Sequence, residues 1–83
     1  MPEVTVYTTR YCGYCRRAKA ILDSKRVAYK EIPLDGDRAG RIELMKRASS
    51  HTVPQIWIGD QHIGGSDELY ALHRAGSLDE LLS

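Results

Sequence analysis

The two cysteines of this 83-residue chain are three positions apart, at Cys12 and Cys15, and follow a short β-branched run. A secreted domain of this size that depends on disulfides normally has more cysteines, spread along the sequence. The fold must therefore rest on a hydrophobic core, which in so short a chain buries only about 60% of the unfolded surface. This length predicts a single small domain, residues 1–83.

Strand patterns and helix patterns alternate over the first half of the chain, and then two strand patterns and two helix patterns follow. Residues 4–8 are β-branched and aromatic and predict a strand, and a helix is expected from about Cys12 onward. The further predicted strands are 27–32, 55–58 and 61–63, and the further predicted helices are 38–48, 66–74 and a short one after Ser77. This β-α-β-α-β-β-α-α order predicts an α/β fold in which a mixed sheet is covered by helices.

Several local signals mark the later helices. Ser66 is expected to be the N-cap of its helix, and Ser77 with Glu80 has the spacing of a capping box. In the helix 38–48 the apolar positions are Ile42, Leu44 and Met45. The first helix is expected to bury a face that consists of Ala18, Ile21 and Leu22.

The formal net charge of +1 argues against a basic nucleic-acid-binding protein. The charge is unevenly spread, because residues 1–47 contain eleven Lys/Arg and six Asp/Glu, whereas residues 48–83 contain one and five. The N-terminal residues lack the pattern of a signal peptide, and no apolar run approaches the ~20 residues of a membrane span. We therefore expect a cytoplasmic protein without a nucleic-acid or membrane partner.

The segment Cys12-Gly13-Tyr14-Cys15 carries the strongest chemical signal. On a helix, positions i and i+3 are about 5 Å apart, within the roughly 4.4–6.8 Å that a disulfide requires. Cys12 at the helix start is near unpaired N–H groups and basic residues, which favour its thiolate, whereas Cys15 is expected to be less exposed. Cys12 is thus predicted to be the nucleophile and Cys15 the resolving thiol of a redox-active pair. The alternatives are a structural disulfide and half of a zinc site.

Three motifs together resemble the glutaredoxin family over essentially the whole chain, and residues 52–56 with 61–65 are most similar to its small bacterial glutaredoxin 3 type. They are the CxxC, Thr52-Val53-Pro54 before the third strand, and Gly64-Gly65-Ser66-Asp67 after the fourth. The resemblance implies a thioredoxin fold with a four-stranded mixed sheet and a glutathione-dependent thiol–disulfide oxidoreductase. It also implies a cis peptide bond between Val53 and Pro54, the alternative being an ordinary strand-initiating proline.

The resemblance further implies a glutathione site. The backbone of Val53 would pair with the cysteinyl part, Ser66 and Asp67 would bind the γ-glutamyl end, and Arg41 would face the glycine carboxylate. Without a ligand, Ser66 and Asp67 would only cap a helix, and Arg41 would be a solvated charge. The implied set is Arg10, Tyr14, Arg41, Thr52, Val53, Pro54, Gly65, Ser66 and Asp67.

The chain departs from the family pattern at two positions near the cysteines. Gly13 stands where a proline is usual, and Thr9 stands where a lysine is usual. Arg10 is one position later and is expected to substitute for that lysine. Gly13 motivates a second hypothesis, in which two monomers hold a [2Fe–2S] cluster through Cys12 and glutathione.

A third hypothesis is a redoxin that thioredoxin reductase reduces, but the Phe-containing C-terminal motif of such proteins is absent, since the chain has no Phe. For the leading hypothesis, the expected partners are glutathione and proteins that are glutathionylated or contain disulfides. Ribonucleotide reductase is a family-level example of such a protein. The protein is expected to be a monomer, with no metal apart from a cluster at Cys12.

Overall fold

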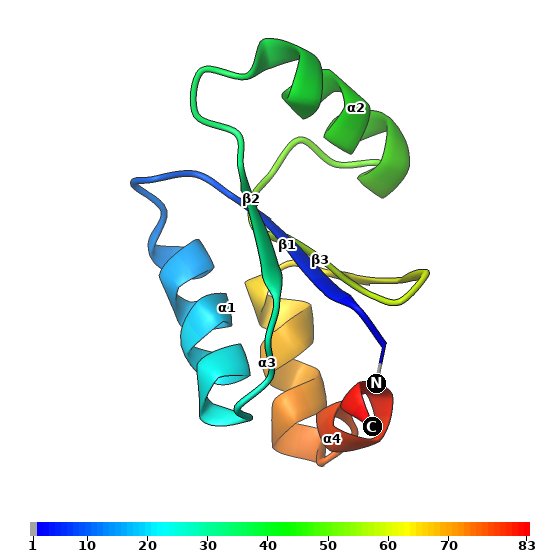
Figure 1. Ribbon diagram of the computed structural model, residues 1–83. Helices are drawn as coiled ribbons and strands as arrows, with labels where there is room; N and C mark the ends of the chain where they lie inside the picture. Colours follow the sequence, from blue (N-terminus) through cyan, green and yellow to red (C-terminus); the bar gives the residue numbers. More distant parts are fainter. Residues whose placement is uncertain (1) are drawn as a thin grey trace.

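The computed structural model describes residues 2–83 and contains four strands and four helices within them (Figure 1). In chain order the elements are β1 (Val4–Thr8), α1 (Gly13–Ser24), β2 (Lys30–Pro33), α2 (Arg38–Ala48), β3 (Gln55–Ile58), β4 (Gln61–Gly64), α3 (Ser66–Ala75) and α4 (Leu78–Leu82). The predicted order of elements is confirmed.

The four strands form one mixed sheet in the order β2-β1-β3-β4. Strand β1 pairs parallel with β2 and antiparallel with β3, and β3 pairs antiparallel with β4. Because β1 and β3 run in opposite directions, the end of β1 lies beside the start of β3, where Tyr7 is opposite Gln55. The segment that follows β1 and the segment that precedes β3 therefore meet at one edge of the sheet.

The main core lies between the sheet and the helices α1, α3 and α4, which cover one face (Figure 1). Its strand residues alternate along β1 and β3, as expected for strands with one face turned to this layer. The predicted apolar face of α1 is buried here. The core consists of Val4, Val6, Ala18, Ile21, Leu22, Ile56, Ile58, Leu69, Leu78 and Leu82.

A smaller core lies on the opposite face of the sheet, under α2 (Figure 1). It consists of Leu34, Leu44, Ala48 and Trp57, with Tyr7 packed against them. The Trp57 ring is stacked on His62 with a centroid distance of 4.5 Å and meets Tyr7 edge-on at 5.5 Å. This aromatic group joins β1, β3 and β4 behind the segment that precedes β3.

Two predicted boundaries are wrong for reasons of local backbone geometry. The second strand begins at Lys30 instead of residue 27, because the chain is still leaving α1: Arg26 has φ of 56°, and the Val27 N–H donates to the Leu22 carbonyl oxygen at 3.4 Å. Ser66 is the first residue of α3 instead of its N-cap, which is Gly65. The Glu68 carboxylate accepts from the Gly65 N–H at 2.7 Å.

Two further predictions about the helices are corrected. Ser77 is the N-cap of α4, but its side chain makes no capping hydrogen bond, because its backbone is already helical (φ −82°, ψ −19°). In α2 only Leu44 of the three predicted apolar positions is buried, whereas Ile42 and Met45 are 43% and 46% exposed. The contact of α2 with the sheet is narrow, so two large apolar side chains stay at the surface.

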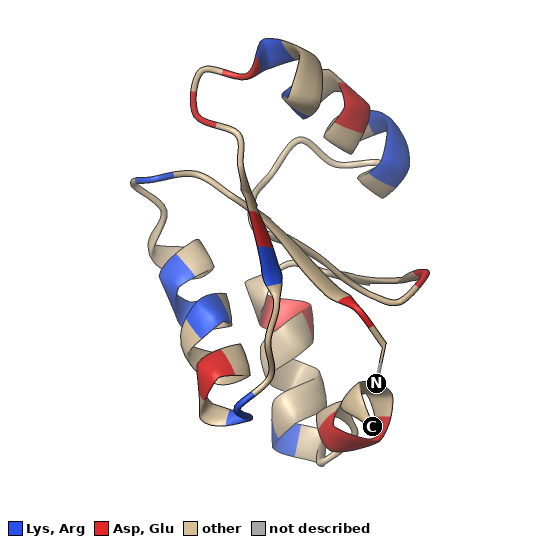
Figure 2. Cartoon of the chain, viewed as in Figure 1, with Lys and Arg blue, Asp and Glu red and all other residues tan. Residues whose placement is uncertain are grey.

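The uneven distribution of charge along the sequence is also seen in the structure, where basic and acidic residues are concentrated on different helices (Figure 2). Lys and Arg lie along α1 and α2, while Asp and Glu lie on α4 and at the start of α3. Since α1 packs beside α3, Arg17 of α1 forms an ion pair with Asp67 of α3 at 3.0 Å. Lys25, directly after α1, forms a second ion pair between the two halves of the chain, with Asp79 of α4 at 3.0 Å. Within residues 2–83, every helix is too short or too polar to cross a membrane.

Candidate active site

Cys12 lies at the N-terminal end of α1. It is the N-cap residue, and its sulfur accepts a hydrogen bond from the Cys15 N–H at 3.1 Å. Its carbonyl oxygen accepts from the Arg16 N–H at 3.2 Å, as helix geometry requires. Backbone N–H groups at a helix N-terminus stabilise negative charge on an atom placed before them. The predicted position of Cys12 at the start of this helix is confirmed, and its sulfur lies before the first backbone N–H groups of α1.

Cys15 lies one turn inside α1, where only 1% of it is exposed. Burial, and then the hydrogen bond with Cys12, raises the pKa of the Cys15 thiol from 9.0 to about 12. Both cysteines are free in this structure. The two sulfurs are therefore adjacent but unequal: one meets the surface at a helix end, and the other is buried and keeps its proton at neutral pH.

The segment before β3 lies directly opposite Cys12. The Val53–Pro54 peptide bond is cis, as the resemblance implies. The Cys12 thiol donates to the Val53 carbonyl oxygen at a sulfur–oxygen distance of 3.6 Å. A thiol-containing ligand bound along Val53 would thus bring its own sulfur close to that of Cys12.

A groove of about 370 Å³ runs from this segment to the start of α3. Seven of the nine predicted glutathione-binding residues line it, and Glu68 is an additional residue that the sequence did not single out. The lining is Tyr14, Thr52, Val53, Pro54, Gly65, Ser66, Asp67 and Glu68. The structure therefore brings the three sequence motifs together around one groove.

The end of the groove at α3 offers a carboxylate and an unpaired hydroxyl. Asp67 is exposed, and one of its oxygens binds Arg17 at 3.0 Å. The Ser66 hydroxyl is buried and has no hydrogen-bond partner among the described residues. A buried polar group without a partner is unfavourable, so a polar ligand at this end would satisfy a group that the chain alone leaves unpaired.

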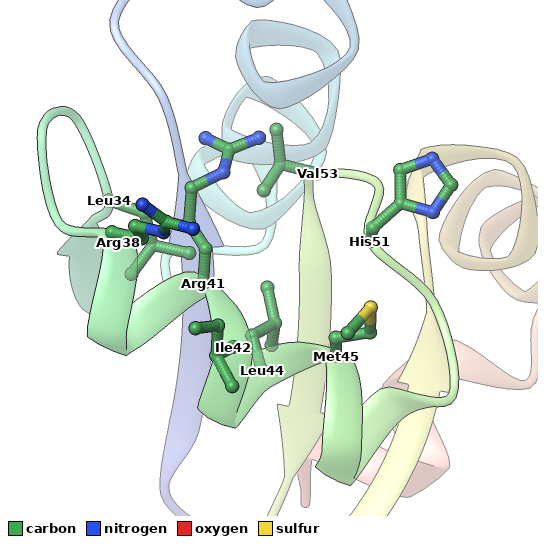
Figure 3. A pocket seen from close by; sticks show the side chains of 8 residues that line it. All are labelled: Leu34, Arg38, Arg41, Ile42, Leu44, Met45, His51 and Val53. Atoms are coloured by element: carbon green, nitrogen blue, oxygen red, sulfur yellow. The ribbon is translucent and has the colours of Figure 1, made fainter.

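The two predicted basic contacts lie outside this groove. Arg41 lines a neighbouring pocket on α2, which shares Val53 with the groove (Figure 3). Arg10 lines neither cavity, and its backbone N–H donates to both carboxylate oxygens of Asp35, at 2.9 and 3.1 Å. Arg41 can reach a ligand that extends past Val53, whereas Arg10 lies on the exposed approach to Cys12.

Two residues behind the groove hold its Thr52-Val53-Pro54 wall, and sequence analysis did not identify them. The buried Gln55 side chain donates from Nε2 to the Thr52 carbonyl oxygen and Oγ1, at 3.1 and 3.2 Å. Its Oε1 therefore faces His62 and accepts from His62 Nε2 at 2.7 Å. The only feature of the sequence that could have indicated this role is that Gln55 is a polar residue at the start of an otherwise apolar strand.

The described residues do not surround the cysteines with metal ligands. Within residues 2–83 there is no group of three or more His, Cys, Asp or Glu side chains placed to hold a metal ion. A zinc site would need two more ligands beside Cys12 and Cys15. The described part of the chain does not supply them.

Comparison with known proteins gives one consistent family. The family model described as Glutaredoxin matches residues 4–63. "Glutaredoxin" of Pseudomonas aeruginosa is 57% identical over 83 residues, which cover all of this chain and 99% of that protein. "Glutaredoxin 3" of Escherichia coli K12 is 55% identical over 82 residues, covering 99% of each.

Solved structures agree with the sequence matches. A buckwheat glutaredoxin–glutathione complex has a TM-score of 0.89 at 36% identity, with 98% of this chain and 76% of that chain covered. The glutaredoxin from Brucella melitensis also has a TM-score of 0.89, at 45% identity, with 99% and 89% covered. The observed sheet order and helix placement are thus those of the thioredoxin-like fold in these proteins.

Proposed function

The chain belongs to the glutaredoxin family and is a glutathione-dependent disulfide oxidoreductase, and we propose that Cys12 is its nucleophile and Cys15 its resolving thiol. The observation that supports these roles is the difference between the two sulfurs. Cys12 accepts a helix N–H and lies next to the groove, whereas Cys15 is 1% exposed with a pKa raised to about 12. Only the thiolate attacks a disulfide, so Cys12 is the sulfur able to react first.

The reaction begins on a protein–glutathione mixed disulfide. The Cys12 thiolate attacks the glutathione sulfur, a new S–S bond forms between them, and the protein sulfur leaves as a thiolate that takes up a proton. A second glutathione thiolate then attacks the bound glutathione sulfur, which gives glutathione disulfide and returns the Cys12 thiolate. The helix N-terminus stabilises Cys12 as a leaving group, which speeds this second step.

The buried Cys15 provides the second branch of the reaction. When Cys12 is joined to a partner, Cys15 loses its proton and attacks the Cys12 sulfur, the partner leaves as a thiolate, and the Cys12–Cys15 disulfide forms. Two glutathiones reduce that disulfide. Because burial is the largest cause of the raised pKa of Cys15, few Cys15 thiolates are present at neutral pH. We therefore expect glutathione to compete well with Cys15 for the mixed disulfide.

We propose that glutathione is held by the groove together with the neighbouring pocket that contains Arg41. We propose that the cysteinyl part lies along the Val53 backbone beside Tyr14, and that the γ-glutamyl end reaches the start of α3. There the Asp67 carboxylate pairs with the ammonium group, and the Ser66 hydroxyl, which lacks a partner among the described residues, meets the carboxylate. The glycine carboxylate extends past Val53 toward Arg41.

A glutathione-coupled assay on a glutathionylated peptide tests the roles of the two cysteines. We expect Cys12→Ser to abolish deglutathionylation and Cys15→Ser to keep it. The Cys15 variant is a matched control, because it also removes one sulfur atom from the same helix. Residual activity of Cys12→Ser comparable to that of Cys15→Ser would contradict the assignment.

A [2Fe–2S] cluster between two chains is a second proposal. Such a cluster needs four ligands, and each chain offers one accessible cysteine sulfur, because Cys15 is buried. Two chains and two glutathiones would therefore be required. Nothing lies within 4 Å of where a Cβ on Gly13 would stand, so the surface above the helix start is open to a second chain. Anaerobic reconstitution with glutathione tests the proposal, and no visible absorbance and no dimer would reject it.

The partners and compartment follow from the same site. We propose that the cluster-free protein is a cytoplasmic monomer that acts on glutathionylated and disulfide-containing proteins, with ribonucleotide reductase as one example. All residues of the groove come from one chain, and a thiol pair that glutathione must regenerate requires a reducing compartment. Sedimentation of the reduced protein tests the monomer, and reduction of a purified ribonucleotide reductase tests that substrate.

A further inference from the structure

A second pocket adjoins the active-site groove across Val53 (Figure 3). It has a volume of about 290 Å³ and lies against α2, and we call it the α2 pocket. Val53 lines both cavities, and its carbonyl oxygen is 3.6 Å from the Cys12 sulfur. A molecule that occupies the α2 pocket would therefore begin next to the reacting sulfur.

Much of the α2 pocket is apolar. Leu34 and Leu44 are almost fully buried in it, and Ile42 and Met45 stand at its edge with 43% and 46% of their surface exposed. Covering such side chains with an apolar partner is favourable, because their surface is removed from water. Glutathione has no apolar side chain, so the glutathione site proposed above leaves this part of the pocket unexplained.

The pocket also has a positive side. Arg38 and Arg41 are three positions apart on α2, and Figure 3 shows their guanidinium groups on the same side of the pocket. Neither forms a salt bridge with another residue of 2–83, and no Asp or Glu lines the pocket. Arg41 is already assigned to the glycine carboxylate of glutathione, which leaves Arg38 for a different anionic group.

We propose that the α2 pocket binds the polypeptide of the glutathionylated target, selecting a segment with an apolar and an acidic side chain next to the modified cysteine. The apolar side chain lies against Ile42 and Met45, and the acidic side chain pairs with Arg38. This inference rests on the proposed function and specifies its substrate class. Because the pocket and the groove share Val53, the occupant is expected to be part of the substrate, and the positive charge of Arg38 favours an acidic side chain on it.

Kinetics on matched substrates test the proposal. The substrates are a glutathionylated peptide with Leu and Glu beside its cysteine, the same peptide with Ser and Lys there, and the mixed disulfide of glutathione with cysteamine. We expect wild type to have a five- to tenfold higher kcat/KM on the first peptide than on the second. Arg38→Gln and Met45→Gln should each reduce this preference at least threefold. Lys46→Gln, which removes a positive charge from the same helix outside the pocket, should keep it.

Other kinetic results would contradict either the proposed role of the α2 pocket or the proposed function. Equal kcat/KM on the two peptides, or equal effects of Arg38→Gln and Lys46→Gln, would overturn the proposal. If Arg38→Gln lowered activity on the cysteamine disulfide as much as on the Leu/Glu peptide, the pocket would belong to glutathione. Failure of wild type on the cysteamine disulfide would contradict the proposed function itself, which separates the two claims.

A binding measurement without turnover provides a second test. The Leu/Glu peptide with serine in place of its cysteine is added to the ¹⁵N-labelled reduced protein. We expect the largest amide shifts at residues 38–45 and at Val53. Shifts confined to α1, α3 or α4 would place the polypeptide elsewhere and overturn the proposal.

Discussion

Gln55→Leu should loosen the wall of the proposed glutathione groove without moving either cysteine. The Gln55 side chain is 3% exposed and joins Thr52 to His62 through three hydrogen bonds. Leucine has a similar size and fits the buried position, but it cannot hold the segment that contains Val53. The expected defect is therefore in glutathione binding instead of in the attack by Cys12.

The magnitude follows from the number of bonds and the exposure of their partners. Thr52 and His62 both reach solvent, so water can replace their lost partner, and each bond is worth about 0.5–1.5 kcal/mol. We expect the free energy of unfolding to fall by about 2 kcal/mol, and the Tm to fall by roughly 10 °C in a domain of this size. If about 1 kcal/mol of this loss is also lost from glutathione binding, because the wall must be ordered again in the complex, KM for glutathione rises about fivefold.

Thermal unfolding and glutathione-dependent turnover measure these effects. His62→Phe is the matched control, because it retains a ring against Trp57 and loses only the contact to Gln55 Oε1. We expect its KM to remain within about twofold of wild type, and kcat to change less than about twofold in both variants. An unchanged KM in Gln55→Leu together with a lowered Tm would refute the role of Gln55 in the groove. Equal KM increases in both variants would assign the effect to His62.

Three further predictions address the site and the core. The pKa of Cys15 is raised from 9.0 in the unfolded chain to about 12 in the folded one, so the unfolded state loses this proton first and stability falls as pH rises through this interval. In reducing buffer, the free energy of unfolding of wild type should fall by about 2 kcal/mol more than that of Cys15→Ser between pH 8.5 and 10.5. An equal fall in the two proteins would contradict the raised pKa of Cys15. Asp67→Asn should raise KM for glutathione by about five- to thirtyfold with little change in Tm, because its ion pair with Arg17 is exposed; an unchanged KM would remove Asp67 from the site. Leu69→Ala should cost about 2–5 kcal/mol in denaturant unfolding, since Leu69 is fully buried in the main core, and a cost below 1 kcal/mol would argue against that packing.

The local features of the site were readable from the sequence. The CxxC follows a β-branched strand at helical spacing, so Cys12 at a helix start and Cys15 one turn inside could be predicted from the period of the helix. The motifs around Val53 and Asp67, which we propose bind glutathione, were found by their resemblance to a family. Helix caps were less predictable: Ser66 and Ser77 have the expected residue types, but Gly65 takes the first cap position and the Ser77 backbone is already helical.

Contacts between distant segments could not be predicted in the same way. Arg17 and Asp67 are fifty positions apart and meet because α1 packs beside α3. In the sequence, Gln55 is only one polar residue in an apolar strand. The fold shows that its side chain is buried and forms hydrogen bonds with Thr52. In α2, the helical period does not show how wide the buried face is, so Ile42 and Met45 could not be distinguished from Leu44.

The sequence by itself determined the chemistry of this protein: a thiol pair at a strand–helix junction, the residue types that accompany it, and the order of the strands and helices. These depend on local spacing and backbone preference, which a few neighbouring residues set. Only the tertiary structure decided which residues line the groove and the α2 pocket together. The antiparallel pairing of β1 with β3 brings Val53 next to Cys12. The narrow contact of α2 with the sheet leaves a pocket beside them that is lined by apolar side chains and two arginines. Such contacts depend on how whole faces pack, and local sequence patterns do not specify that.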